Sequence, residues 1–211
     1  MDEKESTPVA VGETSTEMRP GFWDTLLCDI EWSGGPVDVE NDQDPEGWRA
    51  KGLDRKRLVN CLHNLGFYST VMYRCSRWLF ERGLKLPAYM VQMFNHSLTG
   101  AEISHKADVG PGLRIGHPQG VFIGPDVKIG FRSTFNQGTA LSSNIGMESG
   151  TPDVGNYLYM SPGAKVFGHV KIGHRVWVGP NSVAMKDIED DKVVLGVPGR
   201  AMPPSFRSGG A

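Results

Sequence analysis

The chain has few cysteines, no long apolar run and almost no net charge. The chain has three cysteines, Cys28, Cys61 and Cys75. Their odd number, and the lack of the spacing typical of a disulfide framework, favour a reducing compartment. No stretch of about 18 apolar residues could span a bilayer. With 22 basic and 24 acidic residues, the net charge of −2 gives no strong field for nucleic acid or anionic lipid. The acidic, polar N-terminus lacks the features of a signal peptide, so we expect a soluble cytoplasmic protein that binds neither nucleic acid nor membrane.

Aliphatic residues recur at every sixth position through the second half of the chain. With two interruptions, at Val121–Phe122 and at 142–153, the series is Ile103, Val109, Ile115, Ile123, Ile129, Phe135, Leu141, Val154, Met160, Val166, Ile172, Val178 and Ala184. Neither the helix period of about 3.6 nor strand alternation gives this repeat. A parallel β-helix does, because each short strand with its corner is one hexapeptide and stacked coils bury a continuous column.

The predicted fold class is α+β, with an N-terminal α-helical domain followed by a left-handed parallel β-helix of hexapeptide repeats. We expect a disordered leader at 1–20, a helical domain at 21–99, the β-helix at 100–189 with a protruding loop at 142–153, and a C-terminal tail at 190–211. In the helical domain, apolar spacing predicts helices over 22–30, about 54–82 with a break near Gly66, and 87–97.

One corner of the predicted β-helix carries a histidine beside a narrow slot. Coil counting places Gln137 above His117, followed by Pro162 and Pro180, at the strand spacing of about 4.8 Å. Glu102 lies nearly one coil below, within reach of the far ring nitrogen. The sequence GHPQGVFIG indicates a bulge at His117, and bulges re-aim side chains near functional sites. The arrangement suits acyl transfer from a thioester, and a plain surface imidazole is the alternative.

Several stretches resemble the serine acetyltransferase group of hexapeptide-repeat acyltransferases. They are GAEISHKADVGPGLRIGHPQGVFIG, FNQGTA, MSPGAKVFGHVKIG, VWVGPNSVAMKDI, GVPGRA and the helical segment GFYSTVMYRCSRWLFERG. The resemblance covers residues 40–202. It implies an acetyl-CoA-dependent O-acetyltransferase that needs no metal and acts on a small-molecule hydroxyl acceptor. It also implies a homotrimer with sites between subunits, or a dimer of such trimers.

The resemblance assigns the catalytic and acceptor-binding roles residue by residue. His117 matches the catalytic base and Glu102 the carboxylate that orients it. Asp44, Gln137 and Thr151 match acceptor-binding positions, although Asp44 before a proline is also a common turn residue.

The coenzyme and the transfer step follow from the same resemblance. Backbone groups of Pro162, Gly179 and Pro180 should line the coenzyme A channel, with Lys186 and Arg200 near the phosphates. The base takes the acceptor proton as the oxygen attacks the thioester. The oxyanion should be held by a backbone N–H near Gly138 or by one from a neighbouring subunit.

Two departures from the family bear on the acceptor. Gly150 and Thr151 replace an Arg–His pair, and Gly116 replaces the Asp before the catalytic histidine. Both changes remove groups that grip an amino-acid acceptor. A sugar or other small alcohol therefore competes with serine as the acceptor, and serine O-acetylation in cysteine biosynthesis stays the alternative.

Two further interpretations are open. His169 and His174 have the spacing of zinc ligands in γ-class carbonic anhydrases, with Ser133 at the expected third position. The other is a non-catalytic trimeric β-helix scaffold. Separately, Trp177 is at an outward-leaning position that suits a subunit contact. His63 is expected to be a solvated surface residue.

Overall fold

The computed structural model describes residues 20–35, 55–143 and 150–207, and begins with a helical region. In the described ranges the helices are α1 (Phe22–Ser33), α2 (Arg55–Leu62), α3 (Leu65–Glu81) and α4 (Lys85–Thr99). The helices predicted over 22–30 and 87–97 are confirmed, each a few residues longer. The helix predicted over 54–82 has the expected break, two residues before Gly66: Asn64 interrupts it and its side chain accepts a hydrogen bond from the N–H of Gly66 at 2.8 Å. The predicted leader lies outside the described residues, apart from its last residue.

Short strands follow α4 to the end of the described chain. They are β1 (Glu102–Ile103), β2 (Asp108–Val109), β3 (Arg114–Ile115), β4 (Phe122–Ile123), β5 (Lys128–Ile129), β6 (Thr134–Phe135), β7 (Ala140–Ser142), β8 (Asp153–Val154), β9 (Tyr159–Met160), β10 (Lys165–Phe167), β11 (Lys171–Ile172), β12 (Trp177–Val178), β13 (Val183–Ala184), β14 (Val193–Leu195) and β15 (Arg200–Met202), before a 3₁₀ turn, η1 (Pro204–Arg207).

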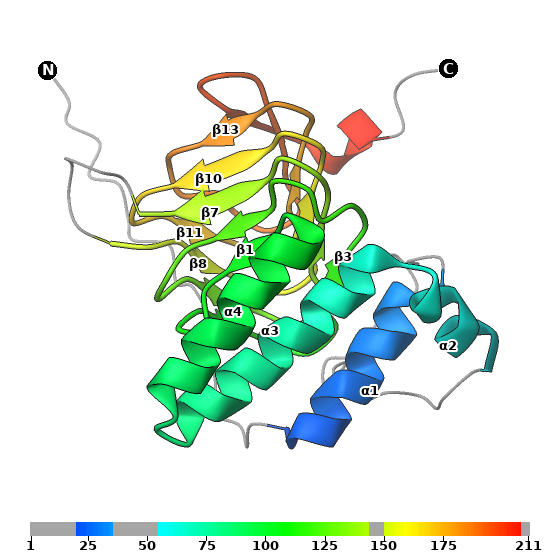
Figure 1. Cartoon of the computed structure of the whole chain (residues 1–211). Coiled ribbons are helices and arrows are strands. Elements are labelled where there is room, and N and C mark those ends of the chain that lie inside the picture. The colour runs from blue at the N-terminus through cyan, green and yellow to red at the C-terminus, as the bar shows by residue number, and fades with distance from the viewer. Residues whose placement is uncertain (1–19, 36–54, 144–149, 208–211) are drawn as a thin grey trace, which may run out of the picture.

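The strands form three sheets that are the faces of a triangular β-helix. Sheet A has the order β1-β4-β7-β10-β13, sheet B β11-β8-β5-β2, and sheet C β15-β14-β12-β9-β6-β3. All pairings are parallel except that of β14 with β15. Figure 1 shows the sheet A strands stacked one above another, with β1 beside the helices and β13 at the far end. The β-helix predicted by the six-residue repeat is confirmed.

The length of each coil shows where the repeat is interrupted. The pairings Phe122↔Ala140 and Lys165↔Val183 each span 18 residues, which is three hexapeptides. Glu102↔Phe122 spans 20, so the first coil contains two extra residues. Ala140↔Lys165 spans 25 and contains the predicted loop, of which residues 144–149 lie outside the described part. Each insertion therefore sits at a corner and leaves the strands in register.

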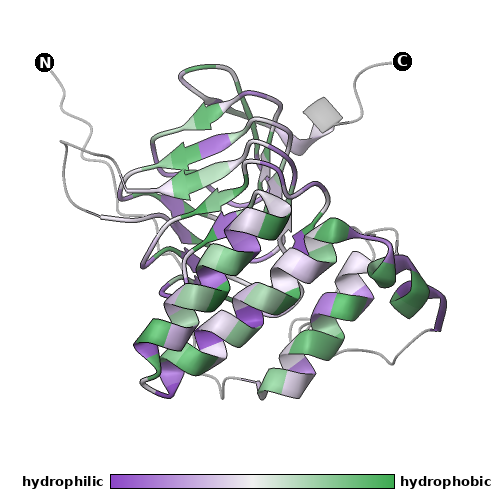
Figure 2. Cartoon of the chain, viewed as in Figure 1, coloured by the Kyte–Doolittle hydropathy of each residue, from purple (hydrophilic) through white to green (hydrophobic). Residues whose placement is uncertain are grey.

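The repeated aliphatic side chains fill the interior of the β-helix. None of the thirteen is more than 6% exposed, and they belong to one continuous cluster. The smaller residues four positions later, such as Ala107, Thr139 and Ser182, are buried as well. Burying one such aliphatic side chain is worth about 1.5–3 kcal/mol, so the column dominates the stability of this half. Figure 2 shows the apolar strand residues in green.

The stacked coils continue further than the sequence pattern predicts. Val193 pairs with Trp177, so β14 adds a parallel strand to sheet C beyond Ile188. β15 then turns back and pairs with β14 in the antiparallel direction, with Arg200 opposite Leu195. The segment expected as a tail thus closes the top of the β-helix.

A buried ion pair fixes the helices to the first coil. Arg74 of α3 donates two hydrogen bonds to the Asp29 carboxylate of α1, at 2.8 and 3.0 Å. The same carboxylate accepts from the backbone N–H groups of Gly112 and Leu113, each at 2.8 Å. Both side chains are buried, and removing one member of such a pair typically costs about 3–5 kcal/mol.

None of the described helices is long and apolar enough to cross a membrane.

Candidate active site

The two extra residues of the first coil fall at His117. Below the corner, Gly116 N–H donates to Phe135 O at 2.8 Å; beyond it, Gly138 N–H donates to Gln119 O at 2.9 Å. Residues 117–119 of the first coil therefore lie opposite a single residue, Gln137, of the next coil, which accounts for the two extra residues. The bulge predicted at His117 is present, and it leaves the imidazole exposed.

A hollow of about 320 Å³ opens beside this imidazole. It is lined by two short segments, one before α3 and one at the bulge: His63, Asn64, Leu65, Gly116, His117, Pro118 and Gln119. Gly66 brings the two together, because a Cβ there would lie 1.9 Å from the carbonyl oxygen of Ile115. Close contact of α3 with β3 thus places the α2–α3 turn against the histidine corner.

His63 is a candidate that the sequence analysis placed on the plain surface. Its Nδ1 lies 3.0 Å from Val59 O, and because a carbonyl only accepts, Nδ1 carries the proton. In the neutral ring, Nε2 is then an acceptor for a group in the hollow. The sequence signal was the His–Asn–Leu–Gly run at the helix break, but no spacing links it to a bulge 54 residues later.

Glu102 lies on the outer side of sheet A, past the same corner. It is exposed and pairs with Phe122, while Gly100 O accepts from Gly120 N–H at 2.9 Å. Among the described residues, no hydrogen bond joins this carboxylate to the His117 ring. The predicted pair is thus placed on two sides of one corner and is not hydrogen-bonded in the structure.

The predicted slot runs up the corner between sheets C and A. Gln137, Pro162 and Pro180 are exposed there, one to each successive coil, and Gly179 is buried beside them. The corner itself is formed by Gly120, Gly138, Gly163 and Asn181, all with positive φ of 52–74°. Three of these four are glycines, so no side chain of their own covers the backbone at this corner, although the Asn181 amide lies over Gly163.

The backbone hydrogen bonds of this corner bear on the predicted oxyanion donor, a backbone N–H near Gly138 or one from a neighbouring subunit. Gly138 N–H already donates to Gln119 O, so it is not free for an oxyanion. The donor predicted near Gly138 is therefore not Gly138 itself, because the coil above the bulge uses that group to hold the bulge in place.

Other predicted residues lie elsewhere. Thr151 precedes β8 at the corner between sheets A and B, and its hydroxyl donates to Asp126 O at 2.8 Å. Lys186 is exposed at the same corner, between β13 and the bridge of Ile188 to Ile172. Arg200 is exposed on β15, at the top of sheet C. Asp44 lies outside the described residues.

The histidines considered as zinc ligands have other surroundings. His174 Nδ1 accepts from the N–H of Asn156 at 3.0 Å. Ser133, the expected third ligand, is 1% exposed and faces the interior column. In the described ranges, no three His, Cys, Asp or Glu side chains cluster as metal ligands.

Comparison with known proteins supplies the family. A scan against protein-family models finds no match. The chain is 35% identical over 146 residues to the serine acetyltransferase of Synechococcus elongatus, covering 68% of this chain but only 58% of that protein. It is 30% identical over 168 residues to the serine acetyltransferase of Bacillus pumilus, covering 79% of this chain and 74% of that protein.

Solved structures agree with the sequence comparison. The crystal structure titled serine acetyltransferase in complex with coenzyme A, from Brucella abortus strain S19, matches 86% of this chain and 68% of its own, with 25% identity and a TM-score of 0.70. The predicted architecture, helices followed by a left-handed β-helix, is confirmed by this likeness. The chain belongs to the serine acetyltransferase family.

Proposed function

We propose that the protein is an acetyl-CoA-dependent O-acetyltransferase in which His117 is the general base. The observation that carries the proposal is the position of this imidazole: exposed, on a bulge, facing a hollow and below a corner built largely of glycines. Family membership supports the reaction, and the relative whose title names coenzyme A supports the cosubstrate.

The proposed reaction is one direct transfer. Neutral His117 accepts the proton of the acceptor hydroxyl as that oxygen attacks the thioester carbonyl. The C–S bond then breaks, and the imidazolium returns the proton to the departing thiolate of coenzyme A. Glu102 is proposed to stabilise the imidazolium, which requires its side chain to swing towards the ring from the outer side of sheet A. A neighbouring subunit is the proposed source of the oxyanion donor.

The hollow favours a neutral acceptor. Its polar side chains, His63, Asn64 and Gln119, are hydrogen-bonding groups, and no Lys or Arg is among the described residues that line it. A carboxylate is best held by a cation such as Arg, whereas hydroxyl groups pair well with amide and imidazole groups. We therefore propose a sugar or other small alcohol as the acceptor. Serine is the second candidate, supported by the names of the relatives.

The corner between sheets A and B supports the same choice. A Cβ at Gly150 would lie 2.5 Å from Cβ of His169, so a side chain there would require His169 to move. The Thr151 hydroxyl is taken by Asp126 O, and Pro152 has no N–H to donate. These residues offer no free cation to an amino acid.

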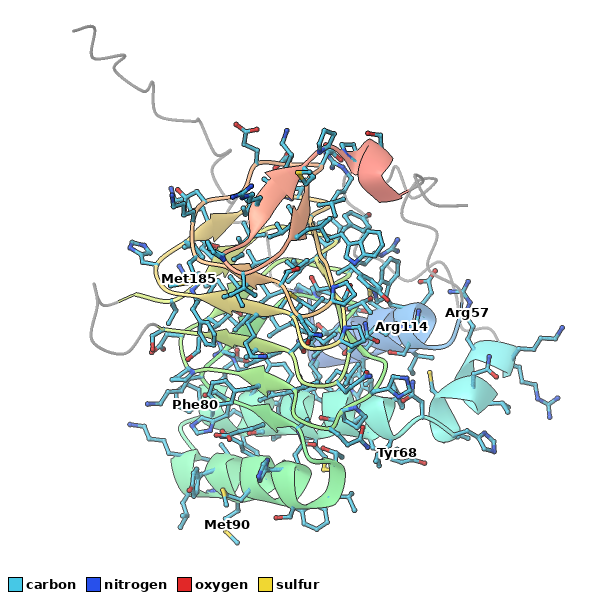
Figure 3. All side chains as sticks on the ribbon, turned by 90° about the horizontal axis from the view of Figure 1, so that it is seen from above. Arg57, Tyr68, Phe80, Met90, Arg114 and Met185 are labelled. Atoms are coloured by element: carbon cyan, nitrogen blue, oxygen red, sulfur yellow. The ribbon has the colours of Figure 1, made fainter. Side chains whose placement is uncertain are left out.

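We propose a homotrimer with sites shared between subunits. The predicted site residues divide between two corners of the β-helix: His117, Gln137, Pro162 and Pro180 at one, Thr151 and Lys186 at the other. One chain cannot bring both sets together, but the two corners of neighbouring chains can meet. A dimer of such trimers is proposed through α4, whose outer face is apolar and exposed, as Met90 shows in Figure 3.

The test is thiol release from acetyl-CoA over a panel of serine, homoserine, hexoses and amino sugars. The native protein should release thiol with at least one acceptor. His117→Ala should lower kcat by about 10²–10⁴ while the circular dichroism spectrum stays unchanged. His96→Ala, which removes an exposed histidine from α4, is the matched control. Near-normal turnover in His117→Ala rules out the base.

A scaffold without activity makes a different prediction. Acetyl-CoA at 100 times its Kd should stabilise the native protein by about 2.7 kcal/mol, which thermal unfolding detects. An unchanged melting temperature at millimolar acetyl-CoA would favour the scaffold.

A further inference from the structure

Two aromatic side chains lie on the outer side of the upper part of sheet C, Tyr159 exposed and Trp177 half-buried. Tyr159 of β9 and Trp177 of β12 are paired residues on neighbouring strands, with ring centroids 5.9 Å apart and planes at 90°. Tyr159 keeps 38% of its surface exposed. Lower on the same face, α1 covers the sheet, and Trp32 donates its indole N–H to the hydroxyl of Thr134 at 3.3 Å. The aromatic pair therefore lies above the part of sheet C that α1 covers.

The indole of Trp177 leans towards the slot. Its N–H donates to the hydroxyl of Ser161, which is only 3% exposed and directly precedes Pro162 of the slot. On the opposite side of the slot, the ammonium of Lys165 donates to the carbonyl oxygens of Gly163 and Gly138, at 3.0 and 3.5 Å. Trp177 on sheet C and Lys165 on sheet A thus flank the glycine corner from its two sides.

The height of the pair above His117 suits one particular ligand. Sheet C rises by three pairings from the coil of His117 to that of Trp177, which is about 14 Å at the usual strand spacing. The extended pantetheine arm of coenzyme A spans about 15 Å between its sulfur and its pyrophosphate, from ordinary bond lengths. A thioester held at His117 therefore brings the nucleotide end to the level of Trp177.

A cation stands just beyond the aromatic pair. β14 stacks on β12, and β15 on β14, so Arg200 lies further up the same face. Its side chain is exposed, and within the described ranges its guanidinium has no hydrogen bond or ion pair. A nucleotide presents both a flat base and phosphate groups, and these match an aromatic surface with an arginine beside it.

We propose that Trp177 and Tyr159 form the adenine-binding surface for acetyl-CoA, with Arg200 next to the nucleotide phosphates. The inference rests on the proposed function and names residues that select its cosubstrate. A purine laid on one ring meets the edge of the other, because the two rings stand at right angles. The enzyme would then prefer acetyl-CoA to thioesters that lack the nucleotide.

The experiment compares coenzyme A with pantetheine, which has the same arm without the nucleotide. Dissociation constants are measured by calorimetry for the native protein and for Trp177→Leu, Trp177→Phe and Tyr159→Leu. Trp177→Leu should weaken coenzyme A about tenfold or more and leave pantetheine unchanged, since one base–aromatic stack is worth that much. Trp177→Phe keeps a ring and should recover most of the affinity. Trp23→Leu, an exposed tryptophan on α1, is the control.

Other outcomes overturn the inference. Equal weakening of both ligands, or no weakening of coenzyme A in Trp177→Leu and Tyr159→Leu, means that the pair does not hold the base. A changed mass of Trp177→Leu in sedimentation equilibrium makes the indole a subunit contact instead. If the native protein binds neither ligand, the proposed function itself fails, which is distinct from native binding that the variants retain. Should Trp177→Leu not fold, Trp177→Phe and Tyr159→Leu decide alone.

Discussion

Glu102 and His117 reach the solvent from two sides of one corner. They can interact only if the Glu102 carboxylate turns towards the imidazole during the reaction. The carboxylate lies on sheet A and the imidazole on the bulge, and in the described structure neither is hydrogen-bonded to the other. If the carboxylate turns to the ring during the reaction, it stabilises the imidazolium and changes the pH at which the base works. If it does not, the histidine acts alone.

Glu102→Gln separates these two cases. We expect kcat to fall by less than about 100-fold, which is milder than the loss of the base, and the pH profile of kcat/KM to shift. Glu189→Gln, at the far end of the β-helix, should change neither. An unchanged pH profile in Glu102→Gln would remove this residue from the mechanism.

The Cys28 thiol shows how burial sets a pH limit on stability. Burial, and after it the neighbouring Asp29 carboxylate, raises the pKa of Cys28 from 9.0 to about 12. The folded chain therefore keeps this proton up to about pH 12, whereas the unfolded chain loses it above about pH 9. The stability contributed by the neutral thiol is complete below pH 9 and is lost as the pH rises towards 12.

Urea unfolding at pH 8 and pH 10.5 measures this loss. The native protein should lose about 2 kcal/mol more than Cys28→Ala over this interval, because each pH unit above the unfolded pKa costs about 1.4 kcal/mol. Equal losses in the two proteins would mean that Cys28 titrates normally in the fold.

Among the elements, the start of α3 is placed by the absence of one side chain. Gly66 lies against the backbone of Ile115, and a Cβ there would overlap the carbonyl oxygen at 1.9 Å. Alanine gains up to about 1 kcal/mol in helix propensity over glycine, but this backbone contact cannot yield as a flexible side chain would. The free-energy cost of the clash with Ile115 therefore exceeds the gain in helix propensity from alanine.

Gly66→Ala should therefore destabilise the protein by about 1–3 kcal/mol in urea unfolding. It should also lower kcat, because the α2–α3 turn that carries His63 moves away from His117. Ser97→Ala on the exposed side of α4 is the control. A variant with native stability and native kcat would show that α3 can shift without consequence for the site.

The elements differ in how far the sequence predicts them. The β-helix is predictable because every inward position obeys the six-residue repeat, from Ile103 to Ala184. β14 is missed because its pairing with Trp177 spans 16 residues and so leaves the repeat. The break predicted near Gly66 is present between α2 and α3, two residues earlier, because the cap at Asn64 sets its place while the apolar stripe runs through it.

The site is predictable only where the repeat carries it. Coil counting places Gln137, Pro162 and Pro180 in one row with His117, as the strand register shows. His63 reaches the hollow through helix docking, a tertiary contact that no local pattern encodes. The division of the predicted site residues between two corners is likewise not predictable from the sequence pattern. It is seen only when the three faces of the β-helix are known.

At the scale of the whole molecule, α4 presents an apolar face with nothing over it in the chain. The exposed side chains on its outer side recur at helical spacing: Leu86, Tyr89, Met90, Met93, Phe94 and Leu98. Ala88, Asn95 and Thr99 are the buried residues of α4. Figure 2 shows the apolar residues along the helix, and Figure 3 shows Met90 pointing away from the β-helix. Contiguous apolar surface of this kind commonly marks a contact between proteins.

We expect this face to pair two trimers, and charge placed on it should separate them. Met90→Glu combined with Phe94→Glu should halve the mass in sedimentation equilibrium from six chains to three, because unpaired carboxylates are costly to bury. Thiol release should persist, since the slot and the hollow lie on other surfaces. Lys106→Glu changes the net charge equally at an exposed corner and should leave the mass unchanged. A double variant that keeps the mass of six chains would leave α4 without a role in assembly, whereas a native mass of three chains would make the trimer the complete molecule.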